Sequence, residues 1–157
     1  MRIARITLSD RASAGVYADQ SGPEIERIVG ELIPGNHEWL VRVMPDEQPE
    51  LEALLRGLCD DEGMDLVVTT GGTGPSARDI TPEATRAVLE RELVGFGEAM
   101  RMRSFVAVPT AILSRATAGT RARTLIVNLP GSPRAIGECL PILIPAICEC
   151  LRHLRGE

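Results

Sequence analysis

The sequence contains no lysine, so all 17 of its cationic side chains are arginines. This absence excludes a Walker-type phosphate loop, because that motif needs a lysine directly after its glycines. Aromatic residues make up only 3% of the chain, which argues against a protein that stacks the bases of single-stranded nucleic acid. The formal net charge is −5, so no overall field attracts nucleic acid or an anionic membrane. An anionic ligand would have to be bound by local features.

The sequence also lacks the motifs of a zinc site and of a membrane-spanning or signal segment. The four cysteines contain no C-x-x-C pair and there are only two histidines, which argues against a zinc site and favours buried thiols. No apolar run approaches the roughly 20 residues that span a bilayer, and the N-terminus lacks the long apolar segment of a signal peptide. We therefore expect a cytoplasmic protein with no membrane partner, folded as one domain over residues 1–157.

The pattern that is present is an alternation of strand-like and helix-like segments. Strands are predicted at residues 3–8, 39–43, 66–69, 111–113 and 124–129. Helices are predicted to begin at Gly22-Pro23, near Leu51, at an N-capping Thr81 and at Ser132-Pro133, the last running to about Leu154. The first of these helices should bury Ile25, Ile28, Val29 and Leu32, and Gly95 with Gly97 should divide the region after Thr81 into two helices. The alternation predicts an α/β fold with a mostly parallel sheet covered on both faces.

A glycine-rich segment follows the third predicted strand directly, as Thr70, Gly71, Gly72, Thr73, Gly74 and Pro75. Ligands of open α/β sheets bind beyond the carboxyl ends of the strands. Glycines let the backbone approach a phosphate and point N–H groups at it, threonine hydroxyls add donors, and the helix near Thr81 adds its positive end. The segment predicts a nucleotide or phosphate site, although a tight turn that merely needs glycine would give the same pattern.

Three aspartates are expected at the same edge of the sheet, Asp10, Asp46 and Asp79. Carboxylates beside a phosphate site repel the ligand unless a cation lies between them. Mg²⁺ binds through one or two carboxylates together with substrate phosphates. Asp46 and Asp79 are therefore candidate magnesium ligands for phosphoryl or nucleotidyl transfer. Helix capping by Asp46 and a turn role for Asp79 remain as alternatives.

Two further segments end predicted strands in ways that suit a ligand. Ser114 and Arg115 offer a hydroxyl and a guanidinium to an anion, or they are ordinary polar residues at an exposed strand end. Asn128, Pro130 and Gly131 form a turn that can approach a ligand closely, or they simply precede a capped helix that begins with a proline.

Taken together and in this order, the segments resemble the molybdopterin adenylyltransferase family of molybdenum-cofactor biosynthesis. The match runs over nearly the whole chain. Its pieces are Ser9-Asp10-Arg11-Ala12-Ser13, Pro45-Asp46-Glu47-Gln48, residues 69–75, Arg78-Asp79, Thr81-Pro82-Glu83-Ala84-Thr85, Gly95-Phe96-Gly97-Glu98 with Arg101, Pro109-Thr110-Ala111, Leu113-Ser114-Arg115 and Asn128-Leu129-Pro130-Gly131.

The resemblance implies a three-layer α/β fold, a homotrimer, and Mg-ATP-dependent transfer of AMP to the molybdopterin phosphate with release of pyrophosphate. A separate molybdate-insertion protein would then be the pathway partner. Asp46 and Asp79 fall on the family's catalytic, metal-binding aspartates. Residues Thr70 to Gly74, with Asp10, fall on its nucleotide and phosphate loop. The pterin side would be lined by Ser114 and Arg115, with Asn128, Pro130 and Gly131 as further substrate contacts.

Two other functions fit the same segments. A non-catalytic module could bind molybdopterin and deliver it to the insertion partner, but a binder would not require both Asp46 and Asp79. The related domains of molybdate-insertion and competence-damage-type proteins usually carry further domains, for which 157 residues leave no room.

Overall fold

The computed structural model describes all residues from 1 to 157 and is built on one six-stranded sheet in the order β2-β1-β3-β6-β5-β4. The strands are β1 (Arg2–Leu8), β2 (Glu38–Met44), β3 (Leu66–Thr70), β4 (Arg91–Glu92), β5 (Ala118–Arg121) and β6 (Thr124–Leu129). The first four strands in this order are parallel, whereas β5 and β4 run antiparallel to their neighbours. The predicted mostly parallel sheet is confirmed. Its central strand β3 is buried along its whole length, as expected when helices cover both faces.

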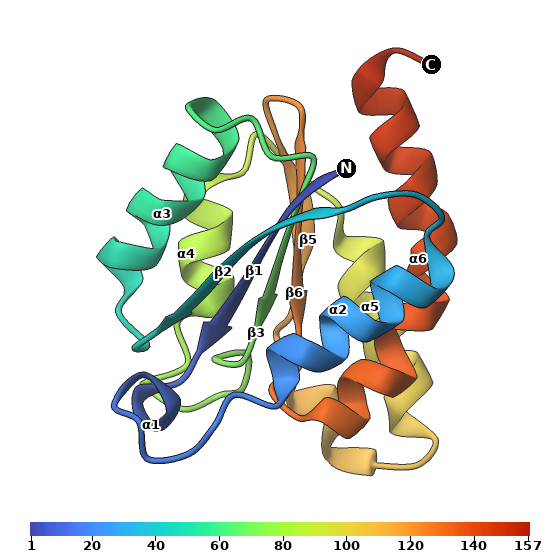
Figure 1. Ribbon diagram of the computed structural model, residues 1–157. Helices are drawn as coiled ribbons and strands as arrows, with labels where there is room; N and C mark the ends of the chain where they lie inside the picture. Colours follow the sequence, from blue (N-terminus) through green and yellow to red (C-terminus); the bar gives the residue numbers. More distant parts are fainter.

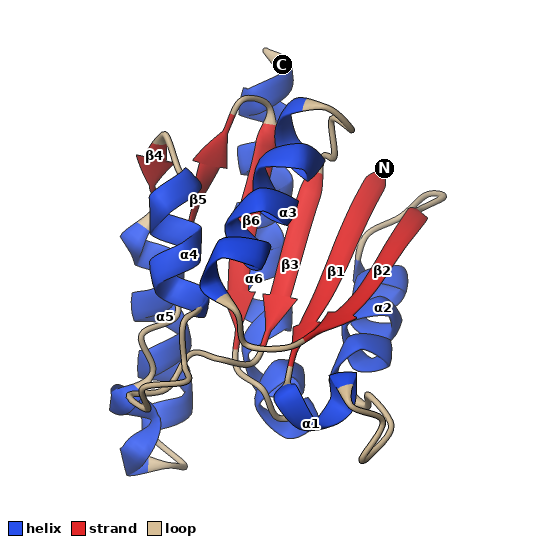
Figure 2. Cartoon of the chain, turned by 90° about the vertical axis from the view of Figure 1, so that its left-hand side faces the viewer, coloured by secondary structure: helices blue, strands red, loops and turns tan.

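Helices form a layer on each face of this sheet (Figures 1 and 2). The helices are α1 (Asp10–Ser13), α2 (Ser21–Leu32), α3 (Gln48–Asp60), α4 (Thr81–Val88), α5 (Val94–Phe105), the 3-10 helix η1 (Pro109–Leu113) and α6 (Pro133–Arg155). Successive strand side chains point to opposite faces, so Ile3 joins the core under α2, α5 and α6, whereas Ala4 joins the core under α3 and α4. The three-layer arrangement is thereby confirmed. None of the helices combines the length and apolar character that crossing a membrane requires.

The antiparallel side of the sheet differs from the prediction. Residues 111–113 were expected as a strand but belong to η1, where Ile112 and Leu113 are exposed. These apolar side chains therefore lie on the protein surface and not in a buried strand. The strands β4 and β5 were not predicted, because β4 has only two residues and β5 reads Ala-Gly-Thr-Arg. The turn from β5 to β6 places Ala122 at φ 50, a conformation that usually selects glycine or asparagine.

The helix boundaries bring four smaller corrections. A four-residue helix, α1, lies inside the expected loop 9–21. The chain does form two helices after residue 81, but the break falls at residues 89–93, and Gly95 and Gly97 lie inside α5. Leu32, at the end of α2, is exposed rather than part of the core. Thr81 does not cap α4, because its hydroxyl donates instead to the carbonyl of Gly71.

Candidate active site

The glycine segment leaves β3 at the carboxyl edge of the sheet in a conformation that requires glycine. Gly71 and Gly72 have φ values of 92 and 63, which lie in the left-handed region. A Cβ on Gly71 would stand 2.3 Å from the carbonyl oxygen of Leu8. The next three backbone N–H groups, those of Gly72, Thr73 and Gly74, donate to no acceptor within the protein. Successive free N–H groups of this kind form a concave binding site for an anion such as phosphate.

Threonine hydroxyls fix this segment in place instead of remaining free for a ligand. The Thr70 hydroxyl donates to the carbonyl of Pro130 at 2.7 Å, and the Thr81 hydroxyl donates to the carbonyl of Gly71 at 2.9 Å. Thr73 is also buried. The expectation that threonine hydroxyls add donors is therefore not met at Thr70, and the backbone N–H groups carry the anion-binding capacity of the segment.

Arg115 braces the same segment from the other side. Its backbone N–H donates to the carbonyl of Thr73 at 2.8 Å. Its guanidinium donates to the carbonyl of Gly74 at 2.8 Å and to that of Asp79 at 2.7 Å, and it pairs with Glu83. Most of the hydrogen-bonding capacity of Arg115 is thus directed at the loop that would cradle a phosphate.

Asp10 and Asp46 lie side by side at the ends of β1 and β2. The Asp46 N–H donates to Oδ1 of Asp10 at 3.0 Å, and the Asp10 N–H donates to Oδ2 of Asp46 at 3.2 Å. The Arg78 guanidinium that bonds Asp10 lowers the pKa of that carboxyl. Burial has the opposite effect on Asp46, where it raises the pKa, and the charge of Asp10 adds to the rise. Helix α3 begins after Glu47 with no side-chain cap, so the capping interpretation of Asp46 is wrong.

One oxygen of Asp46 has no partner. Its Oδ1 is buried and makes no hydrogen bond, yet it lies close enough to Gly72 that a Cβ there would be 2.8 Å away. An unpaired buried carboxylate oxygen costs free energy unless a ligand satisfies it. The atom therefore marks the place where the anion-binding backbone and a carboxylate meet.

Asp79 has the turn role that the sequence allowed and still leaves an oxygen free. Its Oδ2 accepts a hydrogen bond from the N–H of Ser76 at 2.9 Å, and its Oδ1 accepts none. A Cβ on Gly74 would be 2.9 Å from Asp79 Oδ2, so the carboxylate lies against the glycine segment. The negative charge of Asp79 also contributes to the raised pKa of Asp46, which is consistent with the two carboxylates sharing one site.

These donors suit a hard divalent cation that a substrate also helps to bind. No group of three or more His, Cys, Asp or Glu side chains is arranged as a metal cage. Mg²⁺ does not need such a cage, because it keeps several waters and binds through one or two carboxylates plus substrate phosphates. The unpartnered Asp46 oxygen beside the free N–H groups fits that requirement.

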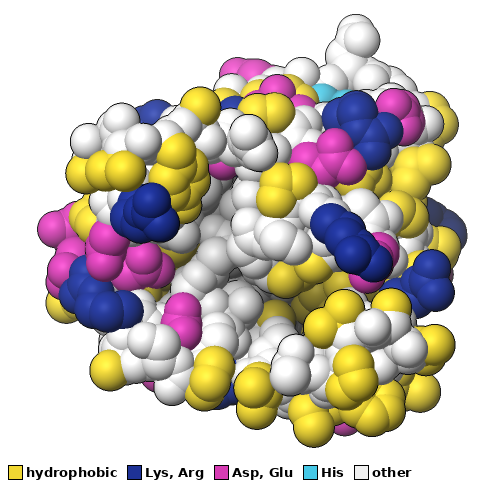
Figure 3. Space-filling view, turned by 90° about the horizontal axis from the view of Figure 1, so that it is seen from below, with side chains coloured by type: hydrophobic (Ala, Val, Ile, Leu, Met, Phe, Trp, Pro, Cys, Tyr) yellow, Lys and Arg dark blue, Asp and Glu magenta, His cyan; other side chains and the backbone are white.

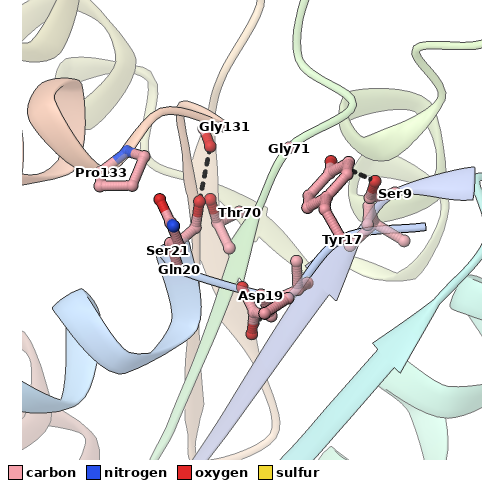
Figure 4. Close-up of a pocket in the computed structure, with 12 residues that line it drawn as sticks. Ser9, Tyr17, Asp19, Gln20, Ser21, Thr70, Gly71, Gly131 and Pro133 are labelled. Carbon is pink, nitrogen blue, oxygen red and sulfur yellow. Dashed lines mark hydrogen bonds between the residues drawn. The ribbon is translucent and has the colours of Figure 1, made fainter. Parts of the chain in front are cut away.

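A polar cavity of about 410 Å³ opens beside the glycine segment, between the start of α2 and the start of α6 (Figure 4). Thr70 and Gly71 of the glycine segment line it, and so does Gly131, which was expected among the substrate contacts with Ser114. The other nine lining residues were not predicted as site residues from the sequence, and they include Ser9, Tyr17, Asp19 and Ser21. Only Asp19 could have been found from the sequence, since an aspartate three residues before Gly22 is a candidate cap for the predicted helix. In the structure its carboxylate does accept the Gly22 N–H, at 3.0 Å.

A second cavity, of about 250 Å³, lies between α5, η1 and the start of α6. Ser114 and Pro130 line it, together with Arg101, Ser104 and Arg134. The two cavities are separated by the turn of residues 130–133, since Pro130 and Ser132 face this cavity whereas Gly131 and Pro133 face the polar one. The turn thus forms a wall between two binding spaces.

Asn128 lies beneath this turn and is not part of its surface. It is fully buried, and its amide donates to the hydroxyls of Thr69 and Thr85 at 3.0 and 2.9 Å. In this structure Asn128 supports the ends of β3 and β6 and contacts neither cavity. The glycine segment, Asp10, Asp46 and Asp79 lie together at this edge of the sheet, with Asn128 as their support. Arg115 was expected on the pterin side with Ser114, but it lines neither cavity and instead braces the glycine segment.

The face that carries these features is hollowed at its centre (Figure 3). Uncharged and backbone atoms line the hollow, a cluster of charged side chains of both signs lies at its left margin in this view, and hydrophobic side chains gather at its lower right margin (Figure 3). The hydrophobic margin fits the exposed residues at the end of α5 and in η1, which are Met102, Phe105, Val106, Val108, Ile112 and Leu113. We call these six residues the apolar margin.

Comparison with known proteins matches residues 4–149 to the family described as the probable molybdopterin binding domain. The chain is 49% identical to the molybdopterin adenylyltransferase of Helicobacter pylori J99 over 157 residues, which cover 100% of this chain and 89% of the relative. It is 49% identical to the molybdopterin adenylyltransferase of Escherichia coli K12 over 140 residues, which cover 89% of this chain and 72% of the relative.

Solved structures agree with these sequence matches. The molybdopterin biosynthesis enzyme MoaB from Thermus thermophilus superposes with a TM-score of 0.89 at 40% identity, covering 99% of this chain and 97% of that one. The glycine segment, the paired aspartates and the three-layer fold thus occur here in a chain whose whole length matches this group. The protein belongs to the molybdopterin-binding family of molybdenum-cofactor biosynthesis.

Proposed function

We propose that this protein is a molybdopterin adenylyltransferase, which transfers AMP from ATP to the terminal phosphate of molybdopterin. The observation that carries the proposal is the unpartnered Oδ1 of Asp46 beside the free N–H groups of Gly72 to Gly74. The two nearly half-identical relatives with that name support the choice of substrate.

The reaction is a displacement at the α-phosphorus of ATP. An oxygen of the molybdopterin phosphate attacks that phosphorus, the bond to the bridging oxygen of the β-phosphate breaks, and pyrophosphate leaves with the electron pair. A phosphate monoester is already ionised at neutral pH, so the attacking group needs no strong base. The protein has to position two anionic groups and offset their repulsion. Both tasks suit a site of glycine, aspartate and arginine without a histidine.

Asp46 and Asp79 are the residues that would hold Mg²⁺, in company with substrate phosphates. The bound ion would supply neutralisation of the charge that builds up on the transferred and leaving oxygens. The free N–H groups at residues 72–74 bind phosphate oxygens and orient them, while Asp10 supports Asp46 through their paired hydrogen bonds. Arg115 keeps the cradle closed by binding the Gly74 and Asp79 carbonyls.

Two cavities divided by one turn suit a reaction with two large substrates. The nucleotide would lie on the glycine segment and extend into the polar cavity beside it. The pterin would occupy the second cavity, which Ser114 and Pro130 line. Both phosphates then meet at the turn, where Gly131 lies beside Gly71, at a distance where a Cβ on Gly131 would be 3.4 Å from the Cα of Gly71.

The apolar margin supports assembly of several copies, with a homotrimer as the expected form. Val106 is 86% exposed and its five companions are also exposed in the single chain. A cluster of large exposed apolar residues marks an interaction surface in a folded protein. Because η1 also lines the second cavity through Thr110 and Ala111, assembly through this margin would fix one wall of the pterin site. The product would pass to a molybdate-insertion protein in the cytoplasm.

Pyrophosphate release tests the proposal directly. Purified protein supplied with Mg-ATP and molybdopterin should release one pyrophosphate for each molybdopterin that becomes adenylylated. Asp79→Asn should reduce this rate by about 100-fold or more, because it removes one of the two carboxylates that would hold the Mg²⁺ ion, and the ion is what would offset charge in the transition state. Binding of molybdopterin without any ATP turnover would instead identify a non-catalytic delivery module. Full activity of Asp79→Asn would refute the role of Asp79.

A further inference from the structure

Arg78 joins three segments of the chain that meet beside Asp10 and Asp46. It lies in the loop 74–80, between the glycine segment and α4. Its Nε donates to Oδ2 of Asp10 at 3.0 Å, and its Nη2 donates to Oδ1 of Asp10 at 2.8 Å. The same Nη2 donates to Oε1 of Glu47 at 3.0 Å. One guanidinium thus ties the loop after β3 to the residues that follow β1 and β2.

The hydrogen bonds continue from Arg78 to Asp46 without a gap. Oδ1 of Asp10 accepts from Arg78 and also from the backbone N–H of Asp46. The Asp10 N–H in turn donates to the carboxylate of Asp46. Arg78 is the only side chain whose hydrogen bonds hold the Asp10 carboxylate, and that carboxylate in turn holds the backbone N–H of Asp46. The backbone from which the Asp46 carboxylate projects toward Gly72 is therefore linked to Arg78.

Stability alone gives little reason for this arrangement. The Arg78, Asp10 and Glu47 side chains are 55%, 46% and 47% exposed, and exposed ion pairs add little to folding because water screens them. What the bidentate contact adds is geometry, since a planar guanidinium fixes both oxygens of one carboxylate. A lysine, which carries a compact charge on a flexible stem, cannot reproduce that contact.

We propose that Arg78 is a positioning residue for adenylyl transfer, which acts through Asp10 to hold the Asp46 carboxylate beside the phosphate-binding backbone at Gly72. The inference rests on the proposed function and adds to it a residue outside the catalytic set. The competing role is that Arg78 leaves Asp10 and binds the ATP phosphates itself, and the experiment separates the two.

A double-mutant cycle on the full chain tests the inference. Pyrophosphate release is measured for wild type, Arg78→Gln, Asp10→Ala and the double variant, at saturating Mg-ATP and molybdopterin. Arg78→Gln should lower kcat by about tenfold or more, because small misplacements of a reacting group have effects of this size. The double variant should be no slower than the slower single variant, since both changes break the same link from Arg78 through the Asp10 carboxylate to Asp46. Arg78→Lys should recover little of the lost rate.

Two controls identify the cause of any loss. Arg152→Gln removes another exposed arginine, which pairs with Glu149 at 2.8 Å far along α6, and it should leave kcat within about twofold of wild type. Calorimetric titration of ATP without Mg²⁺ should give the same affinity for Arg78→Gln as for wild type.

Three results would overturn the inference. An Arg78→Gln variant with wild-type kcat would show that Asp46 needs no such support. Losses that multiply in the double variant, or weaker metal-free ATP binding by Arg78→Gln, would assign Arg78 to the phosphates. Absence of pyrophosphate release by the wild type would refute adenylyl transfer, and with it the role of Arg78. Failure of the proposed function is thereby distinguished from failure of the Arg78 inference alone, in which the wild type remains active.

Discussion

Asp10 and Asp46 each accept a hydrogen bond from the backbone N–H of the other, at 3.0 and 3.2 Å. The exchange joins the ends of the neighbouring strands β1 and β2. It also brings two carboxylates together, and like charges at short range repel. Arg78 offsets the charge of Asp10, whereas Asp46 keeps a buried oxygen without a partner. The pair therefore favours ligand binding at some cost in folding stability.

The first prediction is that Asp46→Asn stabilises the protein while it abolishes activity. The amide oxygen can still accept the Asp10 N–H, and the buried charge disappears. The gain comes from loss of the charge, which burial and the neighbouring Asp10 and Asp79 charges disfavour. The melting temperature at pH 7 should rise by about 2–4 °C, which corresponds to about 1 kcal/mol for a chain of this size. Thermal unfolding and pyrophosphate release, measured on the same samples, check both halves.

The pH dependence of this stabilisation has a definite sign. Burial raises the pKa of Asp46 above its usual 3.8, so ionisation is less favourable in the folded chain than in the unfolded chain. The cost is fully present above the raised pKa and disappears as the pH falls toward 3.8. The advantage of Asp46→Asn should therefore narrow as the pH falls from 7 toward 3.8. An advantage that widens on acidification would contradict the assignment.

The second prediction concerns Gly72, which combines a positive φ of 63 with crowding. A Cβ there would lie 2.4 Å from the Thr81 hydroxyl and 2.8 Å from Asp46 Oδ1. Gly63 has a similar φ of 59 but open space around it. Gly63→Ala should cost about 1–2 kcal/mol from backbone strain alone, with activity unchanged. Gly72→Ala should cost about 1–3 kcal/mol more, because neighbouring atoms must move, and it should lose most activity. Urea unfolding and kinetics measure the difference, and equal behaviour of the two variants would disprove the crowding argument.

The parallel part of the fold and the outline of the site could be predicted, because both depend on strong local signals. Buried parallel strands are nearly continuous in apolar residues, as in residues 66–70. The glycines at residues 71 and 72 predicted a turn with positive φ angles, and both residues have them. The carboxyl ends of parallel strands share one edge, so the gathering of Asp10 and Asp46 followed from the sheet.

The parts that were missed depend on contacts between segments far apart in the sequence. Strand β4 has two residues and exists only because it pairs with β5. Asp19 lines the polar cavity because Arg5 and Thr7 on β1 hold its carboxylate at 2.8 and 2.9 Å. Arg115 suggested an anion ligand by its type, but its guanidinium is directed at backbone carbonyls of another loop. Residue type gives the chemistry that is possible, and packing selects among the partners.

The third prediction follows from that brace. Arg115→Ala removes the contacts to the Gly74 and Asp79 carbonyls, so the phosphate cradle should lose its fixed shape. We expect KM for ATP to rise by about tenfold, equivalent to about 1.4 kcal/mol of binding, with a smaller change in kcat. Arg121 provides a matched control, because it binds Asp60 and the Val88 carbonyl at 3.0 Å, away from both cavities. Both variants lose an arginine that binds a carboxylate and a backbone carbonyl, so their melting temperatures should fall by similar amounts. Arg121→Ala should nevertheless leave KM for ATP unchanged. A raised KM in both variants would point to general loosening of the fold.

The fourth prediction concerns the apolar margin. Val106 is the most exposed large apolar residue of the chain, and Leu32 is also exposed but lies on a different helix from the margin, at the end of α2. Burying an unpaired carboxylate in an interface costs several kcal/mol, so Val106→Asp should break the assembly, whereas Leu32→Asp should not. Light scattering coupled to gel filtration should give three chain masses for wild type and Leu32→Asp, and one for Val106→Asp.

Since η1 lines the second cavity as well as the margin, the separated chain should also bind molybdopterin more weakly while its affinity for ATP is retained. A wild-type protein that elutes as a single chain would contradict the interface, and equal weakening of both substrates would point to unfolding rather than loss of one cavity wall.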